Sequence, residues 1–376
     1  MTLEVGGVLH MIPINDLTRS TDFDDEFFEA LKLLIQSGQF LNGKYTRLLE
    51  TGLAQFLKAD FAIGVANGTA ALSLAFKALE LPVDSGVLLA ANAGGYARIA
   101  LNQNSLKPIY VDVSSSGLLD LRQVEETLNS SGHPIRAMVI THLYGQSHDL
   151  VNIRRIADTY EIQLIEDCAQ SIGAQFAGKT SGSVGDLATF SFYPTKNLGG
   201  VGDSGAVATS NHQLAEKIKS LKQYGWNTKY SVELNDGDNL RIDEIQALAV
   251  YSRLKKIAEK NSKRVEIWNE FNLSANQVGL KLIGTNSTSF VAHLGILDCG
   301  KNRESIQKYF TSQKITTDVH YPIPDHKQIV WSDESCSLPE TERQSGEFLT
   351  IPLFPELSSS EIERIKEALA GLGTIL

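Results

Sequence analysis

The chain has 376 residues and a formal net charge of −10 at pH 7. This acidic balance, with no run of basic residues, disfavours general binding to nucleic acid or to a membrane surface. The length favours two domains or three, and the hydrophobic content of 42% indicates a globular chain rather than a disordered one. No apolar run approaches the ~20 residues that a membrane helix needs, and the first residues lack the pattern of a signal peptide.

The first half of the chain alternates helical patterns with short apolar runs. Amphipathic helices are predicted over residues 23–35, 44–57 and 70–79. Several apolar runs lack the alternation of a half-exposed strand, which favours a parallel sheet covered by helices on both faces. The expected fold class is therefore α/β, with a doubly wound domain. The runs that predict strands span residues 61–67, 87–91, 108–113, 137–145, 162–167, 188–193 and 205–210.

The pattern changes near residue 241. One long charged helix is predicted over residues 242–272, followed by shorter strand-like and helical pieces. We therefore expect a large α/β domain over residues 1–250, which includes the N-terminal segment, and a smaller α+β domain over residues 251–376.

The cysteines disfavour both a disulfide framework and a zinc site. Cys168, Cys299 and Cys336 are odd in number and far apart, and no CxxC spacing occurs. The sequence also lacks an HxxxH pair and a Cys/His cluster, so no metal site is expected. A reducing, cytoplasmic location is predicted.

Two polar residues follow predicted strands in the segment richest in candidate chemistry, residues 164–205. Asp167 ends one apolar run, and ligands of open α/β sheets bind outside the carboxyl ends of strands. Lys196 follows an aromatic run and precedes a glycine-rich stretch. Partial burial would lower the pKa of such a lysine and leave an amine that can form a Schiff base. The alternative for Lys196 is an ordinary surface charge.

Gly68 and Thr69 stand between a predicted strand and a helix. Backbone N–H groups at a helix N-terminus and the Thr69 hydroxyl together suit a phosphate group. The alternative is an ordinary helix start, with Thr69 as the capping residue. A phosphate site, a strand-end carboxylate and a lysine after a strand match the needs of pyridoxal 5'-phosphate, which uses an aspartate to keep its pyridine nitrogen protonated.

The same segments resemble the DegT/DnrJ/EryC1/StrS aminotransferases from about Ile12 to about residue 370. The resemblance rests on NGTAAL, HLYGQ, EDCAQSIGA, GDLATFSFYPTKNLGGVGDSGAVAT, GDNLRIDEIQA, VHYPIPDH and LTIPLFPELS. It implies fold type I of the pyridoxal-phosphate enzymes: a large domain with a mostly parallel central sheet and a smaller α+β C-terminal domain. Members mostly transfer an amino group to nucleotide-linked keto-sugars.

The resemblance also implies roles for individual residues toward the cofactor. Lys196 would form the Schiff base, Asp167 would pair with the pyridine nitrogen, and Gln170 would contact the side of the cofactor that bears its hydroxyl. The remaining contacts would go to the phosphate, from Gly68, Thr69 and Ser191 of one chain and Asn239 of a neighbouring subunit. The implied functional unit is a homodimer with shared active sites. His320, Tyr321 and His326 would line the sugar-nucleotide side.

For most residues beyond Lys196 and Asp167 there is also a purely structural alternative. Gln170 would then cap a helix, and Ser191 would face a neighbouring helix from its strand. Asn239 lies in an Asn/Asp/Gly cluster that is typical of turns. His320 and His326 would be loop histidines with satisfied hydrogen bonds.

Two segments depart from the family pattern. Members usually carry an aromatic residue that stacks on the pyridine ring, but a count back from Pro108 puts Gly94 at that position. Tyr96 is the only aromatic residue nearby and is the candidate for stacking; its alternative is the first turn of the following helix. After the lysine, the usual GEGG is replaced by GDSG, which ends in Asp203, Ser204 and Gly205.

The implied activity is transamination from an amino donor, L-glutamate, to the keto carbon of a nucleotide-linked 3-keto or 4-keto deoxyhexose. Lys196 favours transamination, since relatives with histidine at this position dehydrate sugars instead. One alternative is the same reaction on a cyclitol or a free keto-sugar. The other is a regulatory protein that keeps the cofactor fold without turnover.

Overall fold

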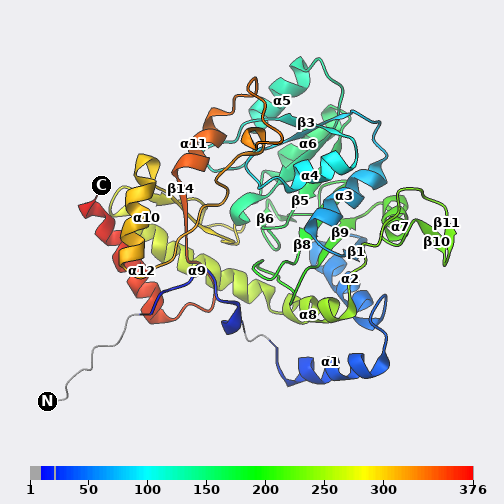
Figure 1. The fold of residues 1–376 in the computed structure, drawn as a ribbon, viewed down its shortest axis with the longest axis horizontal. Helices are drawn as coiled ribbons and strands as arrows, with labels where there is room; N and C mark the ends of the chain where they lie inside the picture. Colours follow the sequence, from blue (N-terminus) through cyan, green and yellow to red (C-terminus); the bar gives the residue numbers. More distant parts are fainter. Residues whose placement is uncertain (1–9, 21–22, 376) are drawn as a thin grey trace.

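A seven-stranded sheet forms the centre of the larger part of the molecule (Figure 1). The structure, a computed structural model, describes residues 10–20 and 23–375. The strand order is β1-β9-β8-β5-β4-β2-β3, in which β9 runs antiparallel to both neighbours and all other pairs are parallel. The mostly parallel sheet expected from the sequence is thus present. Its strands are β1 (Phe61–Val65), β2 (Gly86–Leu89), β3 (Lys107–Tyr110), β4 (Ile135–Thr141), β5 (Gln163–Asp167), β8 (Leu187–Ser191) and β9 (Gly205–Thr209).

Helices cover both faces of this sheet, which explains the apolar runs without alternation. On one face Ile63, Val87 and Val139 pack against three helices, α3 (Gly68–Leu79), α4 (Tyr96–Gln103) and α7 (His212–Leu221). On the other face the alternate strand residues, such as Ala62 and Met138, pack against α2 (Lys44–Leu57), α5 (Leu121–Ser130), α6 (Leu150–Thr159) and α8 (Glu244–Leu254).

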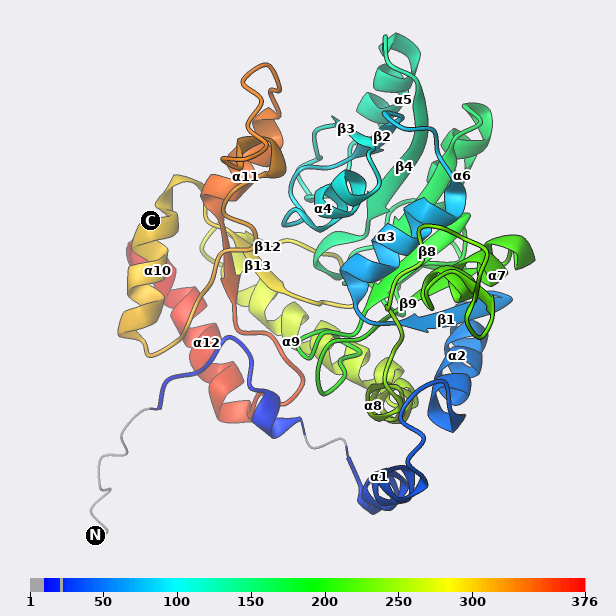
Figure 2. The same cartoon turned by 45° about the vertical axis from the view of Figure 1, so that its right-hand side comes forward.

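A smaller antiparallel sheet forms the centre of the C-terminal part (Figure 2). Its apolar cluster includes Ile12 from the N-terminal segment, which forms a bridge with Ile315. The predicted domain boundary near residue 250 falls inside α8 and stays a prediction. The elements of this part are β12 (Lys281–Leu282), β13 (Gly295–Asp298), β14 (Phe348–Ile351), α9 (Ile257–Asn276), α10 (Arg303–Ser312), α11 (Pro339–Glu347) and α12 (Ser359–Gly371).

Most predicted elements in the first half lie where the sequence patterns put them. The helix predicted over residues 44–57 is α2, with the same bounds. The first predicted helix begins two residues later, as α1 (Asp25–Ser37), because the Asp24 side chain accepts a hydrogen bond from the Phe27 amide and caps the helix there. Two short hairpins lie outside the main sheets: β6 (Gln175–Phe176) with β7 (Lys179–Thr180), and β10 (Trp226–Thr228) with β11 (Ser231–Val232).

The prediction of a single long helix over residues 242–272 is wrong. The chain forms α8 and α9, which are separated by Lys255 and Lys256. The apolar side chains of α8 pack against α1 and α2. Those of α9 from Ile267 onward join the C-terminal cluster, although Ile257 at its start still packs with α8. The two helices therefore contribute mainly to different cores.

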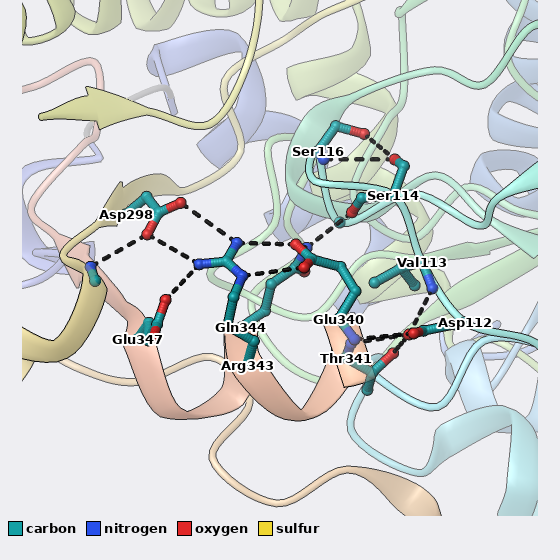
Figure 3. A network of polar contacts seen from close by, with 12 residues as sticks. Asp112, Val113, Ser114, Ser116, Asp298, Glu340, Thr341, Arg343, Gln344 and Glu347 are labelled. Carbon is teal, nitrogen blue, oxygen red and sulfur yellow. Dashed lines mark hydrogen bonds and ion pairs between the residues drawn. The ribbon is translucent and has the colours of Figure 1, made fainter. Parts of the chain in front are cut away.

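Helix α11 connects the two parts of the molecule (Figure 3). Asp112, two residues after β3, accepts hydrogen bonds from the Glu340 and Thr341 amides at the start of α11. Toward its other end, Arg343 pairs with Asp298 at the end of β13. Among the described residues, no helix has both the length and the apolar character needed to cross a bilayer.

Candidate active site

A cavity of about 1120 Å³ lies where the two parts of the molecule meet. The large sheet contributes residues at the carboxyl ends of β5 and β8, and α3 contributes its first turn. The smaller part contributes residues 293–295, 318, 320–321, 350–351 and 353. The cavity therefore lies at the sheet edge where ligands of open α/β folds bind. Predicted site residues that line it are Gly68, Thr69, Tyr96, Asp167, Ser191, Lys196, His320 and Tyr321.

The alternation of β5 and β8 directs polar side chains toward α3. Ile165 and Leu187 pack in the α3 cluster. Successive side chains of a strand point to opposite faces, so Asp167 and Ser191 lie on the same face as these residues. Glu166 lies on the opposite face. Of the two carboxylates at the end of β5, only Asp167 lines the cavity.

The Asp167 carboxylate is buried and lies opposite Lys196. It accepts hydrogen bonds from the Ala169 amide at 3.1 Å and from the Thr141 hydroxyl at 3.4 Å. Burial raises the pKa of Asp167, and this effect is opposed by those hydrogen bonds and by the positive charge of Lys196. The carboxylate is thus suited to pair with a cationic ring nitrogen, because such a partner replaces the lost hydration.

Lys196 lies in a turn directly after β8, where its amide donates to the Tyr193 carbonyl at 2.8 Å. Burial of the ammonium group lowers the pKa of Lys196 to about 8, although the negative charge of Asp167 raises it. An appreciable fraction of the side chain is therefore a free amine near neutral pH. A free amine is the form that attacks a carbonyl group.

The first turn of α3 forms a cradle against the end of β8. Asn67, rather than Thr69, caps this helix: its side chain accepts from the Ala70 amide at 2.8 Å. A Cβ added at Gly68 would lie 2.8 Å from the Ser191 Cβ, so only glycine allows this approach. The amides of Gly68 and Thr69 belong to the first helical turn and lack intrahelical partners. Together with the Ser191 hydroxyl they suit a phosphate group.

Gln170 does not cap a helix in this structure. Its side-chain oxygen accepts from the Tyr144 amide at 2.7 Å, and its nitrogen donates to the Tyr321 hydroxyl at 3.0 Å. Gln170 is not among the described residues that line the cavity. Gln170 is connected to the cavity by its hydrogen bond to Tyr321, and Tyr321 lines the cavity.

Of the predicted substrate-side histidines, only His320 lines the cavity. Its Nδ1 lies 2.9 Å from the Thr350 hydroxyl, and burial lowers its pKa against the opposing charge of Asp318. His326 is fully buried elsewhere and hydrogen-bonds to the Glu342 carboxylate at 3.0 Å. The role predicted for His326 stays a prediction without support from this position.

Asn239 lies outside the cavity of its own chain. It is exposed, and its side-chain oxygen accepts from the Arg241 guanidinium at 2.7 Å. Its neighbours Asp238 and Leu240 line the cavity. The structure describes one chain, so the prediction that Asn239 serves a neighbouring subunit stays a prediction.

The space beside Gly94 is filled by Tyr321. Gly94 has a φ of +78°, and an added Cβ would lie 2.8 Å from the Tyr321 ring. No side chain fits there without moving that ring. Tyr96 is the first residue of α4, and its ring meets that of Tyr321 edge-on at a centroid distance of 6.5 Å. Tyr96 therefore fits both interpretations of its role. It begins a helix, as the alternative expects, and it lines the cavity, as a stacking residue would.

Sequence analysis missed His293, which lines the cavity and is buried. The Asn197 amide group donates to Asn261 and to the Val291 carbonyl, so its oxygen is left to accept from His293 Nδ1 at 2.9 Å. Burial holds the pKa of His293 well below its usual value. No motif surrounds His293, and only the position of Asn197 beside the lysine pointed to this network.

These residues fit pyridoxal phosphate. The glycine-dependent cradle suits its phosphate, the buried Asp167 suits its protonated ring nitrogen, and Lys196 suits its aldehyde. All three lie in one cavity.

The comparisons with known proteins agree with this site. The model of the DegT/DnrJ/EryC1/StrS aminotransferase family matches residues 21–370. The chain is 36% identical over 369 residues to a dTDP-3-amino-3,6-dideoxy-alpha-D-galactopyranose transaminase of Aneurinibacillus thermoaerophilus, covering 96% of this chain and 100% of the relative.

Two solved structures extend the likeness to the cofactor. DesV of S. venezuelae, in complex with a ketimine intermediate, has a TM-score of 0.92 at 29% identity, covering 97% of this chain and 99% of DesV. NtdA of Bacillus subtilis, with bound cofactor PMP, has a TM-score of 0.89 at 27% identity, covering 98% of this chain and 86% of NtdA. The predicted fold and cofactor class are confirmed. The chain belongs to the DegT/DnrJ/EryC1/StrS aminotransferase family and is a pyridoxal-phosphate-dependent sugar aminotransferase.

Proposed function

We propose that this protein transfers the amino group of L-glutamate to the keto carbon of a nucleotide-linked 3-keto or 4-keto deoxyhexose. The observation that carries the proposal is the meeting of Lys196 and Asp167 in one cavity with the Gly68 cradle. The nucleotide-linked substrate is favoured by the name of the Aneurinibacillus relative, which acts on a dTDP-linked sugar.

Each residue has a proposed task in this reaction. When bound, pyridoxal phosphate supplies a ring that draws electrons away from the carbon that loses its proton. Asp167 holds the proton on the ring nitrogen. Lys196 binds the cofactor and, once released from it, carries a proton between donor and cofactor carbon atoms, for which a pKa of about 8 is well suited. Gly68, Thr69 and Ser191 hold the phosphate, and Gln170 orients Tyr321.

The functional unit we propose is a homodimer in which Asn239 of each subunit completes the phosphate site of the other. Helix α1 supports this, because it lies at the margin of the molecule (Figure 2) and carries exposed large apolar side chains. Phe28, Leu33 and Ile35 are 56%, 62% and 55% exposed. A second subunit that covers this helix would bury them. The three cysteines are free, which fits the proposed cytoplasmic location.

The test is a panel of substrates with glutamate, read by mass spectrometry. Nucleotide-linked 3-keto and 4-keto deoxysugars are compared with free keto-sugars and cyclitol ketones. Amination of a nucleotide-linked ketone alone is the expected result. Amination of a free ketone alone would favour the cyclitol or free-sugar alternative. If glutamate leaves the visible absorbance of the bound cofactor unchanged, the regulatory alternative gains.

A further inference from the structure

Behind the cavity, on the opposite face of β5, lies a cluster of buried ionisable groups that the proposed reaction does not use. Glu166 and His142 are fully buried, and His148 is 3% exposed. His142 and His148 follow β4, and Glu166 directly precedes Asp167 in β5. Buried ionisable groups are costly unless each has its hydrogen bonds, so the partners of each group are informative.

Glu166 has a full set of donors. One carboxylate oxygen accepts from the Gly182 amide at 2.8 Å and from His142 Nε2 at 3.0 Å. The other accepts from the Val184 amide at 2.8 Å and the Gly185 amide at 2.7 Å. Burial alone would raise the pKa of Glu166, but its contacts with His142 and the backbone outweigh burial and lower the pKa. Since its two oxygens accept from three backbone amides and from His142, Glu166 is a buried carboxylate anion.

The same hydrogen bonds fix the protonation of both histidines. His142 Nε2 must carry a proton to donate to Glu166, and His142 Nδ1 accepts from the His148 amide at 3.1 Å. His142 is thus neutral. His148 Nε2 accepts from the Leu119 amide at 3.1 Å, so His148 carries its proton on Nδ1, which lies 3.3 Å from His142 Nδ1. Burial also holds the pKa of His148 well below its usual value.

These contacts form one directional chain of donors, from Leu119 through His148 and His142 to Glu166. This row of hydrogen bonds is attached to Asp167, the residue that faces the cavity. The His142 amide donates to the Asp167 carbonyl at 3.0 Å, and Thr141, which precedes it, pairs with Asp167 in the β4–β5 ladder. The side chains of Glu166 and Asp167 point to opposite faces of one strand. Holding the Glu166 side chain in place therefore fixes the rotation of the backbone that directs the Asp167 carboxylate into the cavity.

We propose that His142 is a positioning residue of the active site: a neutral His148–His142–Glu166 relay fixes the end of β5 and thereby aims the Asp167 carboxylate into the cavity. The proposal rests on the role proposed for Asp167 toward the cofactor. The titratable groups whose charges interact with the relay are Asp167 and Cys168 of the same segment.

A metal ion is a less suitable occupant of this cluster. The ligand atoms of His142, Glu166 and Cys168 lie within 4.8 Å of one another. Both nitrogens of His142 and both oxygens of Glu166 are already engaged, and burial raises the pKa of the Cys168 thiol well above its usual value. A metal would have to displace this complete set of hydrogen bonds.

The first test reads the relay directly in the wild-type holoenzyme by ¹⁵N NMR of labelled histidines. We expect one neutral histidine protonated on Nε2, assigned to His142 by its loss in His142→Gln, and one protonated on Nδ1, assigned to His148 by its loss in His148→Gln. His148 should not titrate between pH 6 and pH 8.5, because burial holds its pKa well below the usual value. A charged His142, or one protonated on Nδ1, would overturn the proposal without any reference to activity.

The second test separates positioning from simple stability. His142→Leu removes both the donor and the acceptor, and His142→Gln keeps one of each. The Leu variant should weaken pyridoxal phosphate binding and lower kcat by about tenfold or more, the scale at which outer-shell partners act. Its KM for the keto-sugar should stay unchanged, and the Gln variant should recover most of the loss. Ile140→Val, a buried change on the same face of β4, should leave cofactor affinity unchanged.

Two outcomes separate this proposal from the function on which it rests. Loss of activity in Asp167→Asn, together with wild-type cofactor affinity and kcat in a folded His142→Leu, overturns the positioning role alone. Full activity in Asp167→Asn overturns the role of Asp167, and with it the positioning proposal, while the NMR result would still describe the relay. If the Leu variant does not fold, the NMR test and the Gln variant decide the matter.

Discussion

The ionisation of Lys196 depends on its carboxylate neighbour. Burial lowers the pKa of Lys196 to about 8, and Asp167 acts in the opposite direction. In the apoenzyme, the rate at which pyridoxal phosphate attaches should therefore rise with pH around a midpoint near 8, since only the free amine attacks. In Asp167→Asn the midpoint should move lower, because the charge that favours the ammonium form is gone.

Stopped-flow absorbance across pH 6 to 10 measures this midpoint. Asp203→Asn is the matched control, because Asp203 also lines the cavity but does not contribute to the shift in the pKa of Lys196. A midpoint near 10.5, the ordinary value for lysine, would contradict the prediction, as would one that Asp167→Asn does not move.

Gly68 allows the first turn of α3 to approach the end of β8 closely. Gly68→Ala would bring a methyl group to 2.8 Å from the Ser191 Cβ, so the first turn of α3 must move away from β8. We expect a loss of about 1–3 kcal/mol in phosphate-dependent cofactor binding, the usual cost of overpacking. The measurement is a cofactor titration of the apoenzyme. In the control Gly346→Ala, on α11 with open space around it, affinity should not change, and an equal loss in both variants would exclude the cradle as its cause.

Residue-scale prediction from sequence succeeded where a strand end determined the position. Asp167 ends a buried strand and Lys196 follows one, and the sheet brings such strand ends to one edge. The sequence did not predict that His326 is buried against Glu342, because that partner comes from another element. His142 lies in the segment HLYGQ, but its proposed role depends on hydrogen-bond partners that sequence spacing does not show.

At the scale of elements, α11 depends on a residue far from it in sequence (Figure 3). Asp112 accepts from the Glu340 amide at 2.9 Å, from the Thr341 amide at 2.8 Å and from the Thr341 hydroxyl at 2.8 Å. Asp112→Ala would leave these buried donors unpaired and should lower the free energy of unfolding by about 2 kcal/mol. Urea denaturation followed by circular dichroism measures the change.

Asp149→Ala is the matched control. Asp149 caps α6 by accepting from the Val151 and Asn152 amides, and both donors belong to the same local turn. Asp149→Ala should lower the free energy of unfolding by about 1 kcal/mol. If the two variants were equally stable, α11 would not need its contact with Asp112.

The boundaries of elements were predictable where the chain itself provides them. The bounds of α2 follow from an amphipathic pattern that begins after Gly43 and ends before Lys58. The backbone of Lys58 adopts a left-handed conformation, which ends the helix. The break between α8 and α9 could not be predicted in this way, because residues 253–257 carry no glycine or proline. The direction of β9 was equally hidden, since a buried strand has the same pattern whether it runs parallel or antiparallel.

At the scale of the whole molecule, the exposed apolar side chains of α1 predict the oligomer. Leu33→Asp would place an unpaired charge in the proposed interface, at a cost of about 2–5 kcal/mol. The variant should dissociate at micromolar concentration, and activity should fall with dissociation, because Asn239 of the neighbour is lost. Light scattering alongside turnover measures both.

Val83→Asp is the control for this change. Val83 is 72% exposed, in the connection between α3 and β2, and its substitution should leave assembly intact. A wild-type protein that is a fully active monomer at assay concentration would contradict the dimer.

The binding of an anionic substrate to an acidic chain must come from local donors. The net charge of −10 repels a diphosphate at long range, but the cavity is lined by Lys77, Lys196, His320 and the Tyr321 hydroxyl. Much of a nucleotide-linked substrate lies away from the reacting carbon, so the nucleoside diphosphate alone should bind. At 100 times its Kd it would stabilise the folded state by about 2.7 kcal/mol.

We therefore expect dTDP or UDP to raise the melting temperature of the cofactor-loaded protein. The shift should shrink with added salt, because partly exposed charges are screened. Thymidine and uridine are the controls, since they keep the base and lack the diphosphate, and they should give a much smaller shift. If none of dTDP, UDP, GDP or CDP raises the melting temperature at millimolar concentration while a free ketone is turned over, then the donors of this cavity do not serve a diphosphate, and the substrate is a cyclitol or a free keto-sugar.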